Sequence, residues 1–249
     1  MRSCSFILIL AMFLALPLHA QDLASTCHAS STYDLTLQAH GFLFDRTAPS
    51  PTRVEVSGAS LRVDGVEVRL ATGERSRLTF FERDLGALVP RARAVADHGV
   101  DLATQTVLAE ADRLGLTADA RVELDRRVAA HASRLKQRIA ASRSTRDWNG
   151  PALDQYVSDI TADLLPLITA DLGQQALQAA LSGDTGAALS LRDGALDLAT
   201  GLKSRLRERM QVLRPQIVAL CPSIRQLLEL QGGFTDPYGK PLKLLESDP

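Results

Sequence analysis

The sequence of 249 residues is poor in aromatic side chains, histidine and cysteine. Aromatic residues make up 4% of the chain, and the formal net charge is −1, from 28 basic and 29 acidic side chains. Proteins that bind single-stranded nucleic acid use aromatic stacking platforms and basic grooves, so this composition argues against nucleic acid as a partner. With 45% apolar and 23% charged residues, the chain can bury a substantial core, and we expect neither disorder nor dependence on metal clusters.

Local motifs for phosphate binding and catalysis are also missing. Neither G-x-x-x-x-G-K-[ST] nor G-x-G-x-x-G occurs, which disfavours nucleotide chemistry. G-x-S-x-G, H-E-x-x-H and C-x-x-C do not occur either, and this weakens the hydrolase, zinc-protease and thiol-oxidoreductase interpretations. We therefore assign no catalytic residue, no metal ligand and no cofactor. A hydrolase assembled from distant residues is an alternative, and the sequence leaves open whether the protein is an enzyme.

Residues 1–20 have the composition of an export signal. Arg2 forms a short basic region before the apolar run Phe6–Leu16. Pro17 breaks this run, and Leu18-His19-Ala20 has the form of a cleavage site. An uncleaved N-terminal anchor is the alternative. No later stretch has about 18 uncharged apolar residues, so we expect an exported protein with no transmembrane segment after signal removal.

Removal of the signal leaves two cysteines, Cys27 and Cys221, which are 194 residues apart. An isolated pair in an oxidising compartment is more often bonded than free, so we expect a structural disulfide. The chain-entropy model gives roughly 5 kcal/mol for a loop of this length, and measured gains for long loops fall short of it. Two buried free thiols, or a metal-binding pair assisted by His28, are the alternatives, although neither has ligand spacing in its favour.

The first third of the mature chain has the residue alternation of β-strands. Apolar and polar residues alternate over residues 33–38, which predicts a half-buried strand. The segment 61–70 predicts a hairpin around Asp64-Gly65, because both central positions of a type I′ turn need a positive φ. Pairing across this turn puts Val66 on an apolar face. A hairpin with one apolar face is not stable alone in water and must pack that face against other elements. Residues 21–72 are therefore expected to form a β-meander that packs on helices.

Residues 73–230 have the period of amphipathic helices and predict a helical bundle. A first helix is expected to start near Gly73, and Pro90 is expected to kink or divide it. The segment 142–150 is expected to be a loop. In the helix that follows this loop, Pro166 is expected to interrupt the helix, and Gly173 with the cluster Ser182–Gly186 is expected to mark its end and the following turn.

The last predicted helical region is expected to be kinked or broken at Pro215 and Pro222. Residues 231–249 have no period, and we expect an irregular C-terminal tail that adds little structure. The predicted fold is therefore α+β and predominantly helical. In this prediction a small N-terminal antiparallel β-meander packs on a bundle of long amphipathic helices, and residues 21–230 form one domain.

Charge is segregated between two neighbouring predicted helices. Residues 121–146 contain eight basic and two acidic side chains, and residues 153–184 contain five aspartates and no basic side chain. Helices that pack antiparallel across the 142–150 loop would neutralise each other. The alternative is that the basic face contacts an anionic envelope surface such as phospholipid or polysaccharide. The candidate residues for this contact are Arg126, Arg127, Arg134, Lys136, Arg138, Arg143 and Arg146.

Two further polar features of the sequence are candidate sites. The polar segment Asp97–Asp101 contains His98, but helical spacing puts the two aspartates, and not the histidine, on one face. We expect solvated helix surface there. Trp148 is the only tryptophan and lies in the expected loop, where it is expected to pack over the helices that the loop connects.

Several segments of the mature chain occur in a recognisable order, and together they span nearly its whole length. They are Cys27, the hairpin Leu61–Val66 that leads into Leu70, the helix start Gly73–Arg75, the break Leu88–Pro90, the segment Gly99–Ala103, and Cys221. With these features the chain resembles the YggN-like family of uncharacterised, exported bacterial proteins. The resemblance implies a periplasmic location and the pairing of Cys27 with Cys221, and it supplies no catalytic residue.

The predicted function is that of an exported periplasmic binding or protein-interaction module without catalytic activity. The expected partner is another periplasmic protein or an anionic envelope surface. An envelope-surface or lipid-binding protein that uses the basic face of residues 121–146 is the first alternative, and the hydrolase without a recognisable motif is the second.

Overall fold

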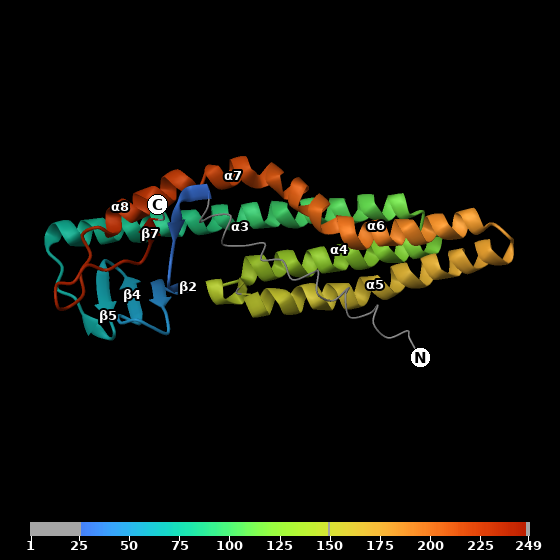
Figure 1. Ribbon diagram of the computed structural model, residues 1–249. Coiled ribbons are helices and arrows are strands. Elements are labelled where there is room, and N and C mark those ends of the chain that lie inside the picture. The colour runs from blue at the N-terminus through green and yellow to red at the C-terminus, as the bar shows by residue number, and fades with distance from the viewer. Residues whose placement is uncertain (1–25, 149, 248–249) are drawn as a thin grey trace. The chain divides into compact units, whose positions relative to one another are not determined.

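The computed structural model describes residues 26–148 and 150–247 (Figure 1). The predicted export signal, residues 1–20, lies outside the described residues. The described chain is α+β and mainly helical, with an N-terminal antiparallel sheet, as the sequence predicted. Within the described part, no helix is both long enough and apolar enough to cross a bilayer.

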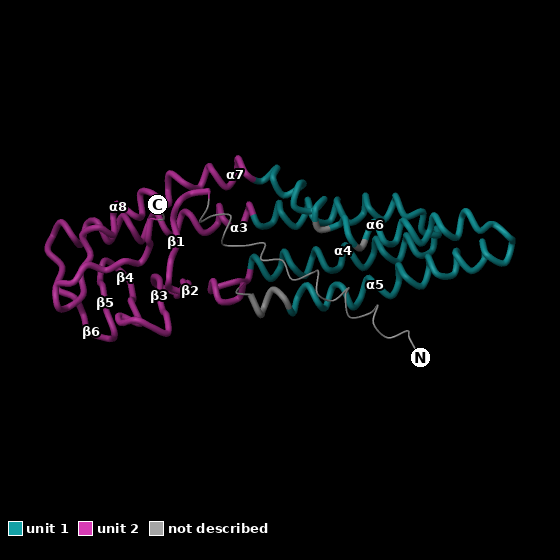
Figure 2. Tube along the Cα trace, viewed as in Figure 1, with its two compact units in different colours: residues 1–16, 96–140, 153–213 teal, residues 17–95, 141–152, 214–249 magenta. Residues whose placement is uncertain are grey.

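Two compact units make up the chain (Figure 2). Unit 1 contains residues 96–140 and 153–213. Unit 2 contains the sheet and the C-terminal segment, within residues 17–95, 141–152 and 214–249. That residues 21–230 form one domain stays a prediction.

Unit 2 is built on a five-stranded antiparallel sheet with the strand order β2-β3-β4-β5-β6. A separate two-stranded sheet pairs β1 with β7. The strands are β1 (Ala29–Ser30), β2 (Asp34–Gln38), β3 (Gly41–Asp45), β4 (Arg53–Ser57), β5 (Ser60–Val63), β6 (Val66–Glu67) and β7 (Glu246–Ser247).

The hairpin between β5 and β6 forms at the predicted turn. Asp64 has a φ of 48° and Gly65 a φ of 83°, as a type I′ turn requires. Val63 pairs with Val66, which confirms the predicted register. The expectation that Val66 lies on a buried face is wrong, since it is 54% exposed. It lies in a two-residue edge strand, and the apolar residue after that strand, Val68, enters the core instead.

The core of unit 2 lies between one face of this sheet and the helices of the same unit. Phe44 of β3 packs against Phe81 of the first helix, with ring centroids 6.2 Å apart. Phe81 in turn meets Phe234 edge to face at 5.5 Å. Such aromatic contacts add to the burial of large apolar area. The meander therefore packs on helices as predicted.

The C-terminal tail contributes to this core, so the expectation that it adds little structure is wrong. Phe234 and Leu244 are 1% and 0% exposed. Gln231 binds the tail: its Oε1 accepts hydrogen bonds from the backbone N–H groups of Leu244 at 2.9 Å and Leu245 at 2.8 Å. A tail without periodicity can still bury single side chains when its backbone N–H groups find hydrogen-bond acceptors, here the side chain of Gln231.

The helices account for most of the chain. They are α3 (Thr72–Leu114), α4 (Ala118–Ala141), α5 (Gly150–Leu181), α6 (Thr185–Met210), α7 (Arg214–Val218) and α8 (Cys221–Gln231), with the 3₁₀ segments η1 (Thr145–Trp148) and η2 (Gln211–Leu213).

Pro90 lies inside α3, so it does not divide this helix. Pro166 and Gly173 lie inside α5, which ends at Leu181. The expected interruption at Pro166 and end at Gly173 are wrong, whereas the expected turn at Ser182–Gly186 is confirmed at residues 182–184. An interior glycine costs about 1 kcal/mol relative to alanine, and the flanking glutamine, alanine and leucine residues favour helix enough to carry α5 past it. The breaks at Pro215 and Pro222 are confirmed, since each is the second residue of a new helix.

Unit 1 is an antiparallel arrangement of four helical segments, seen in Figure 2 as the teal tubes. Contacts between α4 and α5 run in opposite directions along the chain, from Thr117 with Asp171 to Arg127 with Asp163. The final part of α3 packs with α4 and α6 in the same antiparallel sense. Glu110 of α3, which is buried, pairs with Arg205 of α6, with Oε2 and Nε 2.9 Å apart.

Candidate functional site

The predicted disulfide between Cys27 and Cys221 is present in unit 2. Cys221 is the first residue of α8, and both cysteines are buried. The bond excludes the two alternatives, a pair of free thiols and a metal-binding pair with His28. It joins the start of the described chain to the last helix.

The seven residues of the predicted basic face lie in two places. Five are on α4 in unit 1, and Arg143 and Arg146 belong to unit 2. Arg143 donates from Nε to the carbonyl oxygen of Leu37 at 3.3 Å, and the Leu37 N–H donates to the Arg143 carbonyl at 2.7 Å. Arg146 pairs through Nε with Asp34 Oδ2 at 2.8 Å and also pairs with Asp45. Residues 142–148 thus cover the outer edge of β2, which would otherwise present unpaired backbone groups.

Arg126 and Arg127, on α4, share one carboxylate. Arg126 donates to both oxygens of Glu123, with Nη2 2.6 Å from Oε1 and Nε 2.7 Å from Oε2. Arg127 donates from Nε to the same Oε1 at 2.6 Å. Hydrogen bonds from Arg126 and then from Arg127 lower the pKa of Glu123 to about 2. Arg126 and Arg127 are therefore already paired with a carboxylate of their own helix.

The remaining three candidates also have partners. Arg134 donates to Nδ1 of His131 at 2.9 Å. Lys136 Nζ is 2.7 Å from Asp101 Oδ1. The guanidinium of Arg138 lies 6.0 Å from the ring centroid of Tyr156. All seven basic residues proposed from the sequence thus make contacts within the protein.

Ser133 and Lys136 have the S-x-x-K spacing of acylating serines. Such a serine needs a nearby base, and a lysine serves as one only when its pKa is lowered. Here the hydrogen bond to Asp101 raises the pKa of Lys136. Ser133 is exposed on α4, and the geometry gives this pair no nucleophilic role.

One buried polar cluster centres on His131, which is 9% exposed on α4. Its Nε2 is 2.8 Å from Asp163 Oδ2 on α5. Because arginine can only donate, the contact with Arg134 assigns Nδ1 as the acceptor and Nε2–H as the donor to Asp163. The Tyr156 hydroxyl donates to the His131 carbonyl oxygen at 2.9 Å. Both ring nitrogens are engaged, so the cluster joins two helices and offers no free lone pair to a substrate.

Asp163 confirms one part of the predicted charge pairing. Its Oδ1 is 3.0 Å from Nη1 of Arg127. The hydrogen bond from His131, opposed by slight desolvation and supported by the charge of Arg127, lowers the pKa of Asp163. Basic α4 and acidic α5 do pack antiparallel with complementary charges at this point.

The other described aspartates of the acidic segment have different roles. Asp171 accepts hydrogen bonds from the backbone N–H of Thr117 at 3.0 Å and from its hydroxyl at 2.5 Å. Asp159 accepts from Gln155, and Asp184 caps the N-terminus of α6 by accepting from the Ala187 N–H at 2.9 Å. The aspartates of the central part of α5 thus point toward α4.

Between Ala162 and Leu181 the exposed surface of α5 is formed by uncharged residues, although Asp163 keeps 40% of its side chain exposed and Asp159, just before this stretch, is exposed and charged. Two of its members are large and apolar, Leu177 at 60% exposure and Leu181 at 79%. Exposed helix faces are ordinarily charged, as on α6, where Arg192, Asp193 and Asp197 are exposed. We call this surface the neutral face. Its exposed residues are Ala162, Pro166, Thr169, Ala170, Gly173, Gln174, Leu177, Gln178, Ala180 and Leu181.

The sequence already indicated the neutral face, although the number of aspartates in residues 153–184 did not show it. Between Ala162 and Leu181 the only charged residues are Asp163 and Asp171. They are eight positions apart and so lie within about 80° of each other around the helix axis. A helical projection confines both aspartates to about a quarter of the circumference, at angles that Leu181 and Gln178 also occupy further along the helix.

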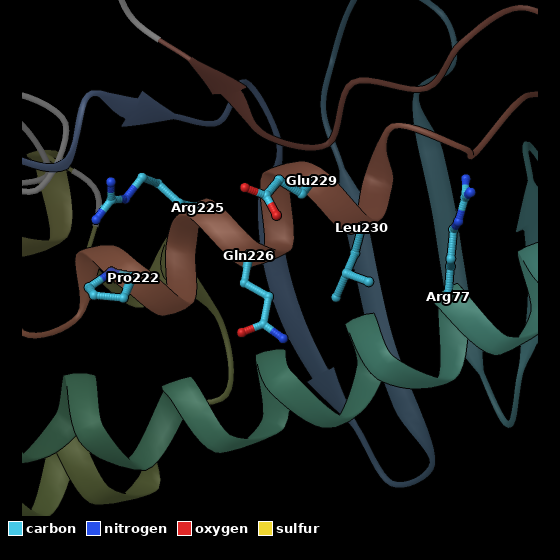
Figure 3. A pocket seen from close by; sticks show the side chains of 6 residues that line it. All are labelled: Arg77, Pro222, Arg225, Gln226, Glu229 and Leu230. Carbon is cyan, nitrogen blue, oxygen red and sulfur yellow. The ribbon is translucent and has the colours of Figure 1, made fainter.

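Unit 2 has an open groove of about 480 Å³ between α3 and α8 (Figure 3). Gln226 and Leu230 point from α8 toward α3 in this view. Arg77, Arg225 and Glu229 place charged groups around the groove. None of its six lining residues is a serine, threonine, cysteine, histidine or lysine, so the groove supplies polar contacts and not a nucleophile.

The two remaining features considered from the sequence fall on ordinary surfaces. Asp101 pairs with Lys136, and within the described residues no three His, Cys, Asp or Glu side chains converge on a metal position. Trp148 donates from Nε1 to Ser142 Oγ at 2.8 Å, inside the segment that covers β2.

The fold and these surfaces define an α+β, mainly helical protein with a disulfide in its sheet-containing unit and a neutral face on one long helix. The chain belongs to the family described as "Protein of unknown function (DUF2884)", whose family model matches residues 27–238. The comparisons with curated proteins and with solved structures found no match.

Proposed function

We propose that this chain is an exported periplasmic protein without catalytic activity, which binds another protein through the neutral face of α5. The export signal of residues 1–20 and the YggN-like character of the chain are part of this proposal. The disulfide between Cys27 and Cys221 supports it, since such bonds persist in oxidising compartments.

The observation that carries the proposal is the neutral face itself. Between Ala162 and Leu181, about 30 Å of helix, none of the exposed residues of α5 is charged, which is unusual on a protein of 23% charged residues. Leu177 and Leu181 add apolar area that solvent contact disfavours. Exposed large apolar side chains that lie next to each other, as these two leucines do one helical turn apart, are a common feature of protein-binding sites.

The basic face of residues 121–146 is the alternative, and its contacts make it the weaker one. A cation that already pairs with Glu123, Asp101 or Asp34 must give up that partner before it binds a phosphate. Arg134→Glu and Arg138→Glu are therefore expected to leave co-sedimentation with anionic vesicles unchanged. The hydrolase alternative has no residues assigned to it.

A photo-crosslinking amino acid in place of Leu177 tests the proposal in the producing cell. We expect ultraviolet light to give a discrete adduct of higher mass, because a bound protein lies within reach of this position. The matched control carries the same amino acid at Gln137, which is exposed on α4, and should give none. Equal labelling at both positions, or no adduct at Leu177, would overturn the proposed function.

A further inference from the structure

We propose that the groove between α3 and α8 binds an acidic peptide segment in an extended conformation, with one carboxylate on Arg77 and a second on Arg225 (Figure 3). The groove belongs to unit 2, so this inference goes beyond the proposed function and does not depend on the neutral face of α5. Three observations support it: the unpaired charges of the groove, the spacing of its two arginines, and the fixed position of α8.

Arg77 and Arg225 differ from the candidate cations of the predicted basic face because neither has a partner. Both are exposed. Within the part of the chain that the structure describes, neither guanidinium makes a hydrogen bond or an ion pair. A guanidinium binds a carboxylate through two parallel hydrogen bonds. These two can do so without giving up a contact inside the protein.

The space between the two arginines suits a peptide main chain. Gln226 points from α8 toward α3 (Figure 3), and among the described residues its amide has no hydrogen-bond partner. A side-chain amide can donate to a peptide carbonyl and accept from a peptide N–H. Leu230 also points toward α3, and Pro222 lines the groove as well, so apolar contact is available beside the polar one.

The spacing of the arginines matches an extended segment. A β-carbon at Gly233 would meet the guanidinium of Arg77, which places this group beside a residue eight positions after Arg225. Eight residues correspond to about 12 Å at the helical rise. In an extended strand, residues i and i+4 lie on the same side and about 13 Å apart. Two acidic residues separated by three others therefore match the two arginines.

Glu229 favours a peptide over a uniformly anionic surface. Its side chain borders the same groove and is exposed, and the described residues give its carboxylate no partner. A membrane of anionic lipids would bring negative charge close to this carboxylate too, and like charges repel. A peptide with uncharged residues between its two acidic ones avoids this repulsion.

Contacts near both ends of α8 hold the groove in shape. Its first residue, Cys221, is bonded to Cys27. Arg91 of α3 donates to the hydroxyl of Ser223 at 2.8 Å. Gln231, the last residue of α8, binds the C-terminal tail. A preformed site loses less conformational entropy when a ligand binds.

The first experiment measures peptide binding to the purified mature chain, with the native disulfide intact, by fluorescence anisotropy. The probe is a rhodamine-labelled, amidated peptide with the sequence Glu-Ala-Val-Ala-Glu. We expect saturable binding that weakens as salt is added. The same peptide with two glutamines in place of the glutamates, and Ala-Val-Glu-Glu-Ala with adjacent acidic residues, should bind at least five-fold more weakly. No saturable binding, or equal binding of the three peptides, would overturn the inference.

The second experiment removes the two cations. Arg77→Ala/Arg225→Ala should raise the dissociation constant of the probe peptide at least ten-fold. The matched control is Arg207→Ala/Arg209→Ala, which removes two exposed arginines of α6 and should change the constant less than two-fold. Equal losses for the two double variants would show attraction to net charge alone and overturn the assigned site. Circular dichroism and thermal melting check that both variants are folded.

Glu229→Gln gives a test in which binding should improve. It removes the carboxylate that borders the groove, so the probe peptide should bind at least two-fold more tightly. A gain of affinity cannot come from misfolding. Unchanged or weaker binding would contradict the placement of the peptide in this groove.

Two further results separate the alternatives. Co-sedimentation with anionic vesicles that Arg77→Ala/Arg225→Ala abolishes would overturn this inference in favour of a lipid surface. The Leu177 photo-adduct reports on unit 1 and the peptide titration on unit 2. An adduct without peptide binding keeps the proposed function and overturns this inference, and peptide binding without an adduct does the reverse.

Discussion

Asp64 accepts four hydrogen bonds at the β5–β6 turn. Its Oδ1 accepts from the backbone N–H groups of Thr52 and Arg53, both at 2.9 Å, and from the Thr52 hydroxyl at 3.1 Å. Its Oδ2 accepts from the Ser50 hydroxyl at 3.1 Å. Slight desolvation tends to raise the pKa of Asp64, but the hydrogen bonds from Arg53 and Thr52 outweigh it and lower that pKa. One side chain thus anchors the turn to the start of β4.

Replacement of Asp64 should separate its backbone role from its charge. Asp64→Ala should lower the free energy of unfolding by about 1–2 kcal/mol, because alanine loses the acceptors and disfavours a positive φ. Asp64→Asn should cost less, since asparagine tolerates that φ and keeps Oδ1. Urea denaturation of the three proteins measures this. Equal losses for the two variants would contradict the assignment.

The same residue predicts a pH dependence. A carboxyl whose pKa is lower in the folded than in the unfolded state stabilises the fold fully above the unfolded value, about 3.9. That contribution is lost as the pH falls through the folded pKa. The stability difference between the wild type and Asp64→Asn should therefore shrink between pH 5 and pH 2, and a difference that grows would rule out a lowered pKa.

At the scale of elements, β2 is an edge strand whose outer side is paired. Its outward N–H groups at Leu35 and Leu37 donate to the Thr145 hydroxyl at 2.9 Å and to the Arg143 carbonyl at 2.7 Å. The segment that the sequence predicted only as a loop, residues 142–150, therefore also closes a sheet edge. Two of the seven candidate anion-binding residues, Arg143 and Arg146, serve this closure.

Hydrogen exchange can detect this pairing. Thr145→Val removes the acceptor for the Leu35 amide and keeps the side-chain shape, so exchange at Leu35 should accelerate about ten-fold or more. The Leu37 amide is the internal control, because its acceptor is a backbone carbonyl that the substitution leaves in place. Unchanged exchange at Leu35 would show that the Thr145 hydroxyl does not protect it.

For the whole molecule, the disulfide closes a loop of 194 residues. Its largest effect is expected in the unfolded chain, where it restricts the conformations of almost the entire sequence. The buried Glu110–Arg205 pair in unit 1 and the tail bound by Gln231 in unit 2 make further links between distant segments.

The double variant Cys27→Ser/Cys221→Ser should lower the free energy of unfolding by about 2–5 kcal/mol, measured by urea denaturation. A reducing agent should lower the stability of the wild type by a similar amount and leave the variant unaffected. A variant as stable as the oxidised protein would show that the bond constrains little.

Local patterns predicted much of this fold. The Asp64-Gly65 hairpin, the helical breaks before Pro215 and Pro222, and the mainly helical α+β class each depend on neighbouring residues, whose spacing is visible in the chain. Gly173 did not end its helix, because its cost of about 1 kcal/mol is small beside the helix propensity of the residues around it. The burial of Phe234 and Leu244 could not be predicted, since it depends on partners far away in the sequence.

For the candidate site, too, some features could be predicted from the sequence and others depended on the tertiary structure. The sequence by itself determined the inventory of charge, the pair of cysteines available for a disulfide, and the helical period of α4 and α5. Only the tertiary structure decided which charges neutralise each other. It turned Asp163 and Asp171 toward α4, engaged all seven candidate cations, and left the neutral face exposed on α5. The physical reason is that periodicity specifies positions around one helix, whereas the partner of each side chain is set by which other helix packs against it.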